Sequence, residues 1–569
     1  MIQKISGVFG FLSKEVQGLQ RAAIILAGAA LLSSILALLR DRYFAHVFGA
    51  GATLDVYYAA FRIPDLIFVG TGALVSVYIL IPELSRRSDA DQKYYLDTIL
   101  TGFSVFAVLA SIVAGLLAPI FLAALFPAFV VSGKLPTVVM LTRIMLLQPI
   151  FLGLSNIFAA VTQARGRYAL YAISPLLYNL GIIVGAGILY PLFGIAGLAW
   201  GVVLGAALHM GIQIPSVMRD GFLNRMPRVH DMRFLSTTVF VSLPRSLALS
   251  MSQLAFVGLI SLAGALTTGS IAVFMFAYNL QAVPLAIIGA SYSVAAFPTL
   301  AAALSQGKRE EFLDHIAAAA RYVLFWSLPA SALVLTLRAH MVRFILGSGA
   351  FDWTDTRLTA AVFALLSLSL AAQGISLLLI RGYYAAGRTF VPLVISAGTA
   401  VLTVLLAWLG IHALSYYPLL AQVQSLMRLS GVPGSGVLSL GIAYALSAII
   451  GAIIMAVHFE YRFGGLFSRI QRTWWEGLIA ALAALAGSYL LLELAGPLDT
   501  GSTTTTVFLQ GLAGGLAGLL ATVLTYWVMG SRELSEIGEA LHGKLFERSM
   551  QASTVVIVAP TEEQVGSVA

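Results

Sequence analysis

The feature that most constrains this chain is a series of apolar stretches of about 20 residues, which repeats along most of its length. Such a stretch is long enough to cross the roughly 30 Å hydrocarbon core of a bilayer as an α-helix. Fourteen stretches qualify: Ala22–Leu39, Pro64–Ile81, Ile99–Leu122, Val138–Thr162, Leu170–Leu189, Gly194–Ile214, Val239–Leu262, Ile271–Ala296, Tyr322–Leu346, Leu358–Ile380, Val391–His412, Val437–Val457, Trp474–Leu494 and Thr506–Val528. The predicted fold class is therefore an all-α polytopic membrane protein with about 14 transmembrane helices.

Composition supports a membrane-embedded chain and excludes several function classes. Charged residues make up only 10% of the sequence, whereas a soluble globular protein has about 25%. The absence of cysteine excludes disulfides, thiolate catalysis and cysteine-based metal sites. The histidines lack metal-ligand spacing, no nucleotide loop of the GxxxxGK[ST] type is present, and no dense basic run suggests nucleic acid. We expect a transporter and not an enzyme, with no cofactor, and leave coupling to an ion or to the membrane potential open.

Loop charges predict the orientation of the spans. With the N-terminus inside, 23 of the 33 Lys and Arg residues fall in cytoplasmic segments, 9 fall outside, and Arg245 lies within a span. This excess follows the positive-inside rule. Both termini are therefore predicted to be cytoplasmic, with residues 1–21 forming a cytoplasmic amphipathic segment.

The chain also resembles itself. Pro82–Leu84 ends the second span and Pro298–Leu300 ends the eighth, while Gln163–Arg167 and Tyr384–Arg388 follow the fourth and the tenth. Offsets of 216 and 221 residues suggest two homologous six-helix lobes, related by a pseudo-two-fold, although chance matching of Gly/Ala-rich helices is the alternative. The predicted divisions are an N-lobe at 22–219, a C-lobe at 220–460, two C-terminal helices at 461–530 and a cytoplasmic tail at 531–569. We expect a cavity between spans one, two, seven and eight.

Charged side chains at membrane depth are costly, which makes each one a candidate for function. Arg245 lies about 9 Å into the seventh span at 1.5 Å per residue, where it could hold a phosphate or snorkel to the headgroups. Charged residues around the first outer loop form either an ion-pair cluster that fixes the loop or a charged outer gate. The candidate substrate contacts are Arg40, Asp55, Arg62, Arg143, Arg245 and Arg381, and the candidate gate or structural residues are Asp41, Arg42, Asp65 and Asn279.

One stretch carries a specific resemblance to a known family. Arg40–Asp41, Phe48–Gly51, Asp55, Ala60–Leu66 and Pro82 resemble the MurJ (MviN-like) lipid II flippases of the multidrug/oligosaccharidyl-lipid/polysaccharide exporter superfamily. The resemblance covers about residues 22–530. It implies a bacterial inner-membrane carrier that moves an undecaprenyl-diphosphate-linked peptidoglycan precursor to the outer leaflet by alternating access. It also implies a lipid-tail groove at the last two spans and, as partners, cell-wall synthesis proteins.

The chain departs from that family at positions where cationic or acidic residues are usual. Ser34, Phe68 and Asn279 replace arginines of the family pattern, Ala73 replaces an acidic residue, and Val391–His412 contains no Asp or Glu for a sodium site. Other arginines of the candidate set would have to supply the missing charge. The alternatives are an exporter of another lipid-linked glycan or amphipathic molecule, and a cell-wall scaffold that does not transport.

Overall fold

The computed structural model describes residues 19–72, 80, 81, 84, 86–222, 232–498 and 502–546. These residues form helices and connecting turns without any strand, which confirms the all-α fold class. The first half contains α2 (Leu19–Phe48), α3 (Ala52–Ala60), α4 (Arg62–Thr71), α6 (Asp89–Leu125), α7 (Pro127–Val131), α8 (Leu135–Met145), α9 (Leu147–Ala164), α10 (Tyr168–Val184), α12 (Ile195–Gly211) and α13 (Ile214–Arg219).

The second half contains α14 (Met232–Gly264), α15 (Ser270–Leu285), α16 (Ser291–Ser305), α17 (Arg309–Leu346), α18 (Trp353–Ser367), α19 (Leu370–Ala385), α20 (Phe390–Leu414), α21 (Tyr417–Leu426), α22 (Leu438–Phe463), α23 (Leu466–Ala495), α24 (Thr504–Val528) and α25 (Arg532–Phe546). Short π-helical turns at Gly185–Leu189 and Ala286–Ala290 extend α10 and join α15 to α16. A π-turn inserted into a helix bends it or shifts its faces.

Ten helical segments of the described chain are long and apolar enough to cross a membrane. The number is 11 if α18 and α19, which meet at an angle of 45°, form one span. The expected spans at Ala22–Leu39, Pro64–Ile81 and Val239–Leu262 overlap α2, α4 and α14, and each includes residues or side chains outside the described part. The total of 14 therefore stays a prediction, whereas the polytopic helical architecture is confirmed.

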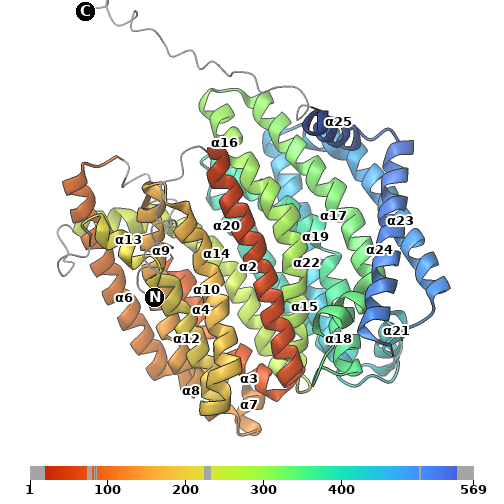
Figure 1. Cartoon of the computed structure of the whole chain (residues 1–569), viewed down its shortest axis with the longest axis horizontal. Helices are drawn as coiled ribbons and strands as arrows, with labels where there is room; N and C mark the ends of the chain where they lie inside the picture. The colour runs from red at the N-terminus through yellow and green to blue at the C-terminus, as the bar shows by residue number, and fades with distance from the viewer. Residues whose placement is uncertain are drawn as a thin grey trace, which may run out of the picture.

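The helices form two groups, with α2 running between them in the view of Figure 1. Helices α6, α8, α9, α12 and α13 lie on the left of this view, and α17, α18, α22, α23 and α24 lie on the right. Helix α2 packs against α10 of the first group and α17 of the second, and α23 and α24 pack together against α17. In Figure 1, α25 lies at the upper end, whereas α3, α7, α18 and α21 lie at the lower end, which the loop charges predict to be the outer face.

Glycines explain why α10 and α12 pack so closely. A Cβ atom on Gly201 would lie 2.3 Å from the Cα atom of Gly185, and one on Gly181 would lie 2.3 Å from the Cα atom of Gly205. Small residues at such crossings let two backbones approach and gain dispersion contacts, which drive helix association in lipid. Of these two helices, α10 also packs against α2.

Candidate functional site

The segments predicted as the N-lobe and the C-lobe are joined at the lower end of Figure 1 by a buried carboxylate. Asp55 of α3 is 4% exposed and accepts hydrogen bonds from the backbone N–H groups of Gly269, at 2.6 Å, and Ala272, at 3.0 Å. These groups belong to the first turn of α15, where helix N–H groups have no partner within the helix and the dipole favours negative charge. An N-lobe carboxylate thus caps a C-lobe helix.

Two further contacts cross between the lobes at this end. Arg42 of α2 donates through Nη1 to the carbonyl oxygens of Phe344, at 2.6 Å, and Ile345, at 3.0 Å, in the last turn of α17. Asp355 of α18 accepts from the backbone N–H of Ala50 at 3.0 Å. The Arg42 cation lies at the C-terminal carbonyls of α17, where positive charge is favoured. The Asp355 carboxylate accepts from an N–H group outside any helix. The described arrangement is therefore closed at this end.

Asp41 occupies the centre of a polar network that also spans the lobes. Its Oδ1 accepts from Nε and Nη2 of Arg40, at 2.9 and 2.7 Å, and its Oδ2 accepts from Nδ2 of Asn279 on α15 at 2.9 Å. Arg40 also donates from Nη1 to Oδ1 of Asn179 on α10, at 2.9 Å. The amide of Asn279 thereby links α15 to α2. Arg40 is therefore held by protein acceptors.

A cavity of about 620 Å³ lies between α4, α14, α15, α19, α20 and α22. The expected spans two, seven and eight contribute to its walls, but spans ten, eleven and twelve contribute as well, and none of the described lining residues comes from the first span. The expected position is thus corrected: the cavity extends into the C-lobe. The physical reason is that α2 packs between α10 and α17 and its Arg40 side chain is bound to Asp41 and Asn179.

Arg62 and Asp65 of α4 are the only charged residues among the described side chains that line this cavity. Arg62 is 3% exposed; its Nε donates to the carbonyl of Tyr58 at 3.1 Å, and its Nη2 lies 3.6 Å from Oδ2 of Asp65. The guanidinium carbon lies 5.0 Å from the centre of the Phe256 ring, a cation–π arrangement. The Nη1 atom is buried and has no hydrogen-bond partner among the described residues. A buried cation with an unused donor is suited to hold an anion.

The remaining walls of the cavity are mostly apolar or carry uncharged polar groups. Several hydroxyl and amide side chains line it, namely Ser252, Gln253, Tyr278, Gln373, Ser396, Thr399, Thr403, Tyr444 and Ser447. These residues were not predicted as a site from the sequence, although Ser396, Thr399 and Thr403 recur at the three- and four-residue spacing that places side chains on one helix face. Such a wall offers hydrogen bonds to a neutral polar group.

The other predicted substrate contacts lie elsewhere. Arg143 of α8 is exposed and donates through Nε to the carbonyl of Gly115 on α6 at 2.9 Å. Arg381 is half-buried on α19, next to Ile380, which lines the cavity. Arg245 belongs to α14, but its side chain lies outside the described residues. The structure thus brings Arg62 and Asp65 to the cavity, and it brings Arg40, Asp41, Arg42, Asp55 and Asn279 to the junction of the lobes.

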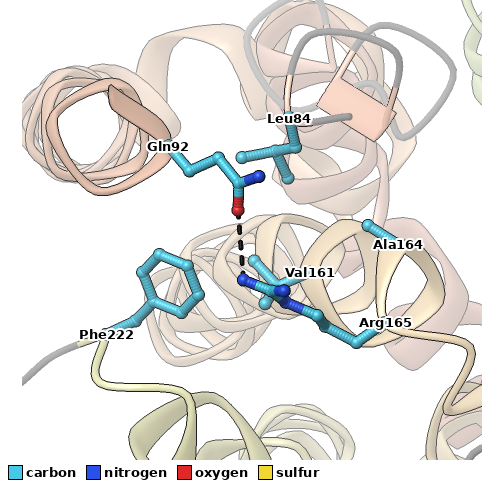
Figure 2. Close-up of a pocket in the computed structure, with 6 residues that line it drawn as sticks. All are labelled: Leu84, Gln92, Val161, Ala164, Arg165 and Phe222. Atoms are coloured by element: carbon cyan, nitrogen blue, oxygen red, sulfur yellow. Dashed lines mark hydrogen bonds between the residues drawn. The ribbon is translucent and has the colours of Figure 1, made fainter. Parts of the chain in front are cut away.

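Figure 2 shows a second, much smaller pocket, of about 50 Å³, in the N-lobe. Arg165, at the end of α9, donates to Oε1 of Gln92 on α6 at 3.2 Å across it, and Leu84, Val161 and Phe222 form apolar walls. The space suits a few water molecules rather than a substrate. Over the described residues, no group of three or more His, Asp or Glu side chains could hold a metal ion.

Comparisons with known proteins agree with this geometry. The sequence model of the family described as "Lipid II flippase MurJ" matches residues 44–509. A "Probable lipid II flippase MurJ" of Bdellovibrio bacteriovorus is 26% identical over 547 residues, 92% of this chain and 99% of the relative. One from Vibrio cholerae is 25% identical over 544 residues, 89% of this chain and 96% of the relative.

Solved structures give the same fold. One described as "Lipid II flippase MurJ, inward closed conformation" has a TM-score of 0.69 and 21% identity, covering 89% of this chain and 99% of the other. An inward-facing multidrug resistance MATE family transporter of the MOP superfamily has a TM-score of 0.61 and 15% identity, covering 78% and 99%. Because the family model spans well over half of the sequence, the chain belongs to the lipid II flippase MurJ family.

Proposed function

We propose that this protein moves a lipid-linked peptidoglycan precursor, lipid II, from the inner to the outer leaflet of a bacterial inner membrane by alternating access. The observation that carries the proposal is the Nη1 atom of Arg62, which is buried at the wall of a cavity of about 620 Å³ and has no partner among the residues that the structure describes. A diphosphate needs cationic donors, and a charge-assisted hydrogen bond contributes about 1.5–3 kcal/mol. The matched relatives carry the same function in their names.

The arrangement of charges suggests how substrate and lobe movement are coupled. Arg62 belongs to α4 of the N-lobe, whereas most cavity walls belong to α14, α15, α19, α20 and α22 of the C-lobe. An anion bound to Arg62 with its neutral part against the hydroxyl wall would contact both lobes at once. Opening the other end requires the bonds of Asp55 and Arg42 to break. The substrate and the bonds of Asp55 and Arg42 would therefore connect the same two lobes, so that substrate binding can shift the equilibrium between open and closed arrangements.

The test replaces the essential flippase of a tractable bacterium with this chain. The wild-type chain should support growth and should expose lipid II to an enzyme added from outside. Arg62→Gln should abolish both, and Arg62→Lys should restore part, because an ammonium cannot form the planar guanidinium contact. Arg219→Gln, an exposed arginine at the end of α13, is the matched control. Full growth with Arg62→Gln would refute the role of Arg62 in transport. Failure of the wild-type chain to support growth would refute the proposed function and favour a scaffold without transport.

We also propose that both termini are cytoplasmic. The support is the 23-to-9 division of Lys and Arg between the two sides. Because the chain has no cysteine, single labelling sites are unambiguous. Ser502→Cys, between α23 and α24, should react with a membrane-impermeant maleimide in intact cells, and Gly307→Cys should not. The reverse pattern would invert the orientation.

A further inference from the structure

Several of the arginines on the predicted outer side gather around the end of α17. Five of the nine basic residues assigned to that side lie there, namely Arg42, Arg338, Arg343, Arg357 and Arg428. Such a concentration is unusual, because basic residues favour the cytoplasmic side. Arg42 binds the terminal carbonyls of α17, and the guanidinium of Arg343 lies 5.6 Å from the centre of the Trp353 ring. Contacts of this kind do not explain why Arg338, Arg357 and Arg428 are placed on this side.

Arg338, Arg357 and Arg428 lie close together, although they come from α17, α18 and the turn after α21. Arg357 donates through Nη2 to the carbonyl of Arg428. The Nη2 of Arg428 lies 3.4 Å from the hydroxyl of Tyr489 on α23. Arg338 lies in the same region, because Thr336, two residues before it, donates to Oγ of Ser488, the neighbour of Tyr489, at 3.1 Å. Arg428 has φ 58°, the one positive φ of a non-glycine residue in the described chain, so its placement is held against a local backbone cost.

No carboxylate of the described part of the chain forms an ion pair with this arginine cluster. None of the ion pairs found among the described residues includes Arg338, Arg357 or Arg428, and Glu493, one turn beyond Tyr489, forms none either. Arg338 instead donates to the carbonyl of Leu335 in its own helix, at 2.5 Å. Neighbouring like charges repel, most strongly where water is scarce. An anionic ligand bound between the three guanidinium groups would offset their mutual repulsion by attraction to each of them.

The surroundings indicate that such a ligand is a lipid. Leu426, at the end of α21, is 76% exposed, and Leu490 and Leu494 of α23 are 65% and 86% exposed. Such apolar surfaces at the edge of a membrane protein face acyl chains. Arg338 lies eight residues before the end of α17, which is about 12 Å along the helix at 1.5 Å per residue. The cluster therefore sits between apolar side chains and the predicted outer surface, the level of a lipid phosphate.

We propose that Arg338, Arg357, Arg428 and Tyr489 bind the diphosphate of an isoprenoid lipid in the outer leaflet. This outer arginine site is separate from the Arg62 cavity, and the identity of its ligand rests on the proposed function. Three guanidiniums match a diphosphate, with two or more negative charges, better than the single charge of a phosphodiester. The site would hold the headgroup phosphates after crossing, while the isoprenoid chain lies along the apolar surface of α23.

The test measures binding of undecaprenyl diphosphate to the purified full-length chain in detergent. All proteins carry Arg62→Gln, so that the cavity contact does not contribute. Adding Arg338→Gln with Arg428→Gln should weaken binding at least tenfold, equivalent to about 1.4 kcal/mol. The corresponding double lysine variant should lose less, because the charges remain. Arg219→Gln, at the opposite end of the molecule, should leave the affinity unchanged.

Three outcomes would overturn the proposal. Unchanged affinity of the double glutamine variant would mean that these arginines only anchor the protein at the interface. Equally strong competition by phosphatidylglycerol would identify a general phospholipid site, and equal binding of inorganic diphosphate would exclude a contribution from the lipid chain. If the double variant elutes as an aggregate, the affinity is measured with Arg428→Gln alone, because Arg428 is exposed and its replacement should not disturb folding. Failure of the growth test would refute the proposed function and leave this binding result standing.

Discussion

The buried carboxylate of Asp55 offers the sharpest test of how the lobes are held together. Asp55→Asn keeps the shape of the side chain, but only one of its two terminal atoms can still accept a hydrogen bond. The other becomes an NH₂ donor facing an N–H donor of Gly269 or Ala272. The joined arrangement should therefore lose a charge-assisted bond and the favourable position at the N-terminus of α15.

The magnitude follows from the geometry. A hydrogen bond to a charged group contributes about 1.5–3 kcal/mol, and a charge at a partly buried helix end adds up to about 2 kcal/mol. Relief from burying a charge at a site that is 4% exposed opposes both terms. We expect a net loss of about 2 kcal/mol, which shifts the ratio of joined to separated forms about 30-fold.

The assay uses a single cysteine at Ala277, a fully buried residue of α15 two turns beyond Gly269. Labelling by an external maleimide should be slow in the parent and markedly faster with Asp55→Asn. Asp352→Asn is the matched control, because Asp352 caps α18 by accepting from the N–H of Asp355 within one lobe, and asparagine caps equally well. Equal labelling rates for parent and Asp55→Asn would refute the reasoning.

Two further predictions follow from the structure. Gly201→Ala should lower the melting temperature, since its Cβ would lie 2.3 Å from the Cα of Gly185 and overpacking costs about 1–3 kcal/mol. Arg167→Gln should destabilise the N-lobe by about 3 kcal/mol in a thermal shift assay, because it leaves Asp220, bonded at 2.8 and 2.9 Å, unpaired.

Much of the architecture could be predicted because membrane insertion depends on local composition. The length of each apolar stretch and the net charge of each loop follow directly from the sequence. They predict the spans and their orientation, since the bilayer has the same thickness and the same charge asymmetry for every span. The Arg40–Asp41 to Ala60–Leu66 stretch also led to the correct family. Asp55 and Arg62 could also be chosen as candidates from the sequence, because a charged residue beside an apolar stretch is recognised without a structure.

The roles of those residues depended on the tertiary structure. Arg62 and Arg143 have the same side chain at comparable boundaries, yet one is buried beside a cavity and the other is exposed. Asp55 binds groups more than 200 positions away in the sequence, and Asn279 reaches Asp41 across the lobes. Hydropathy fixes which segments enter the membrane, but it does not set the rotation of one helix against another. Packing of the helix faces decides that rotation, and with it which polar groups meet.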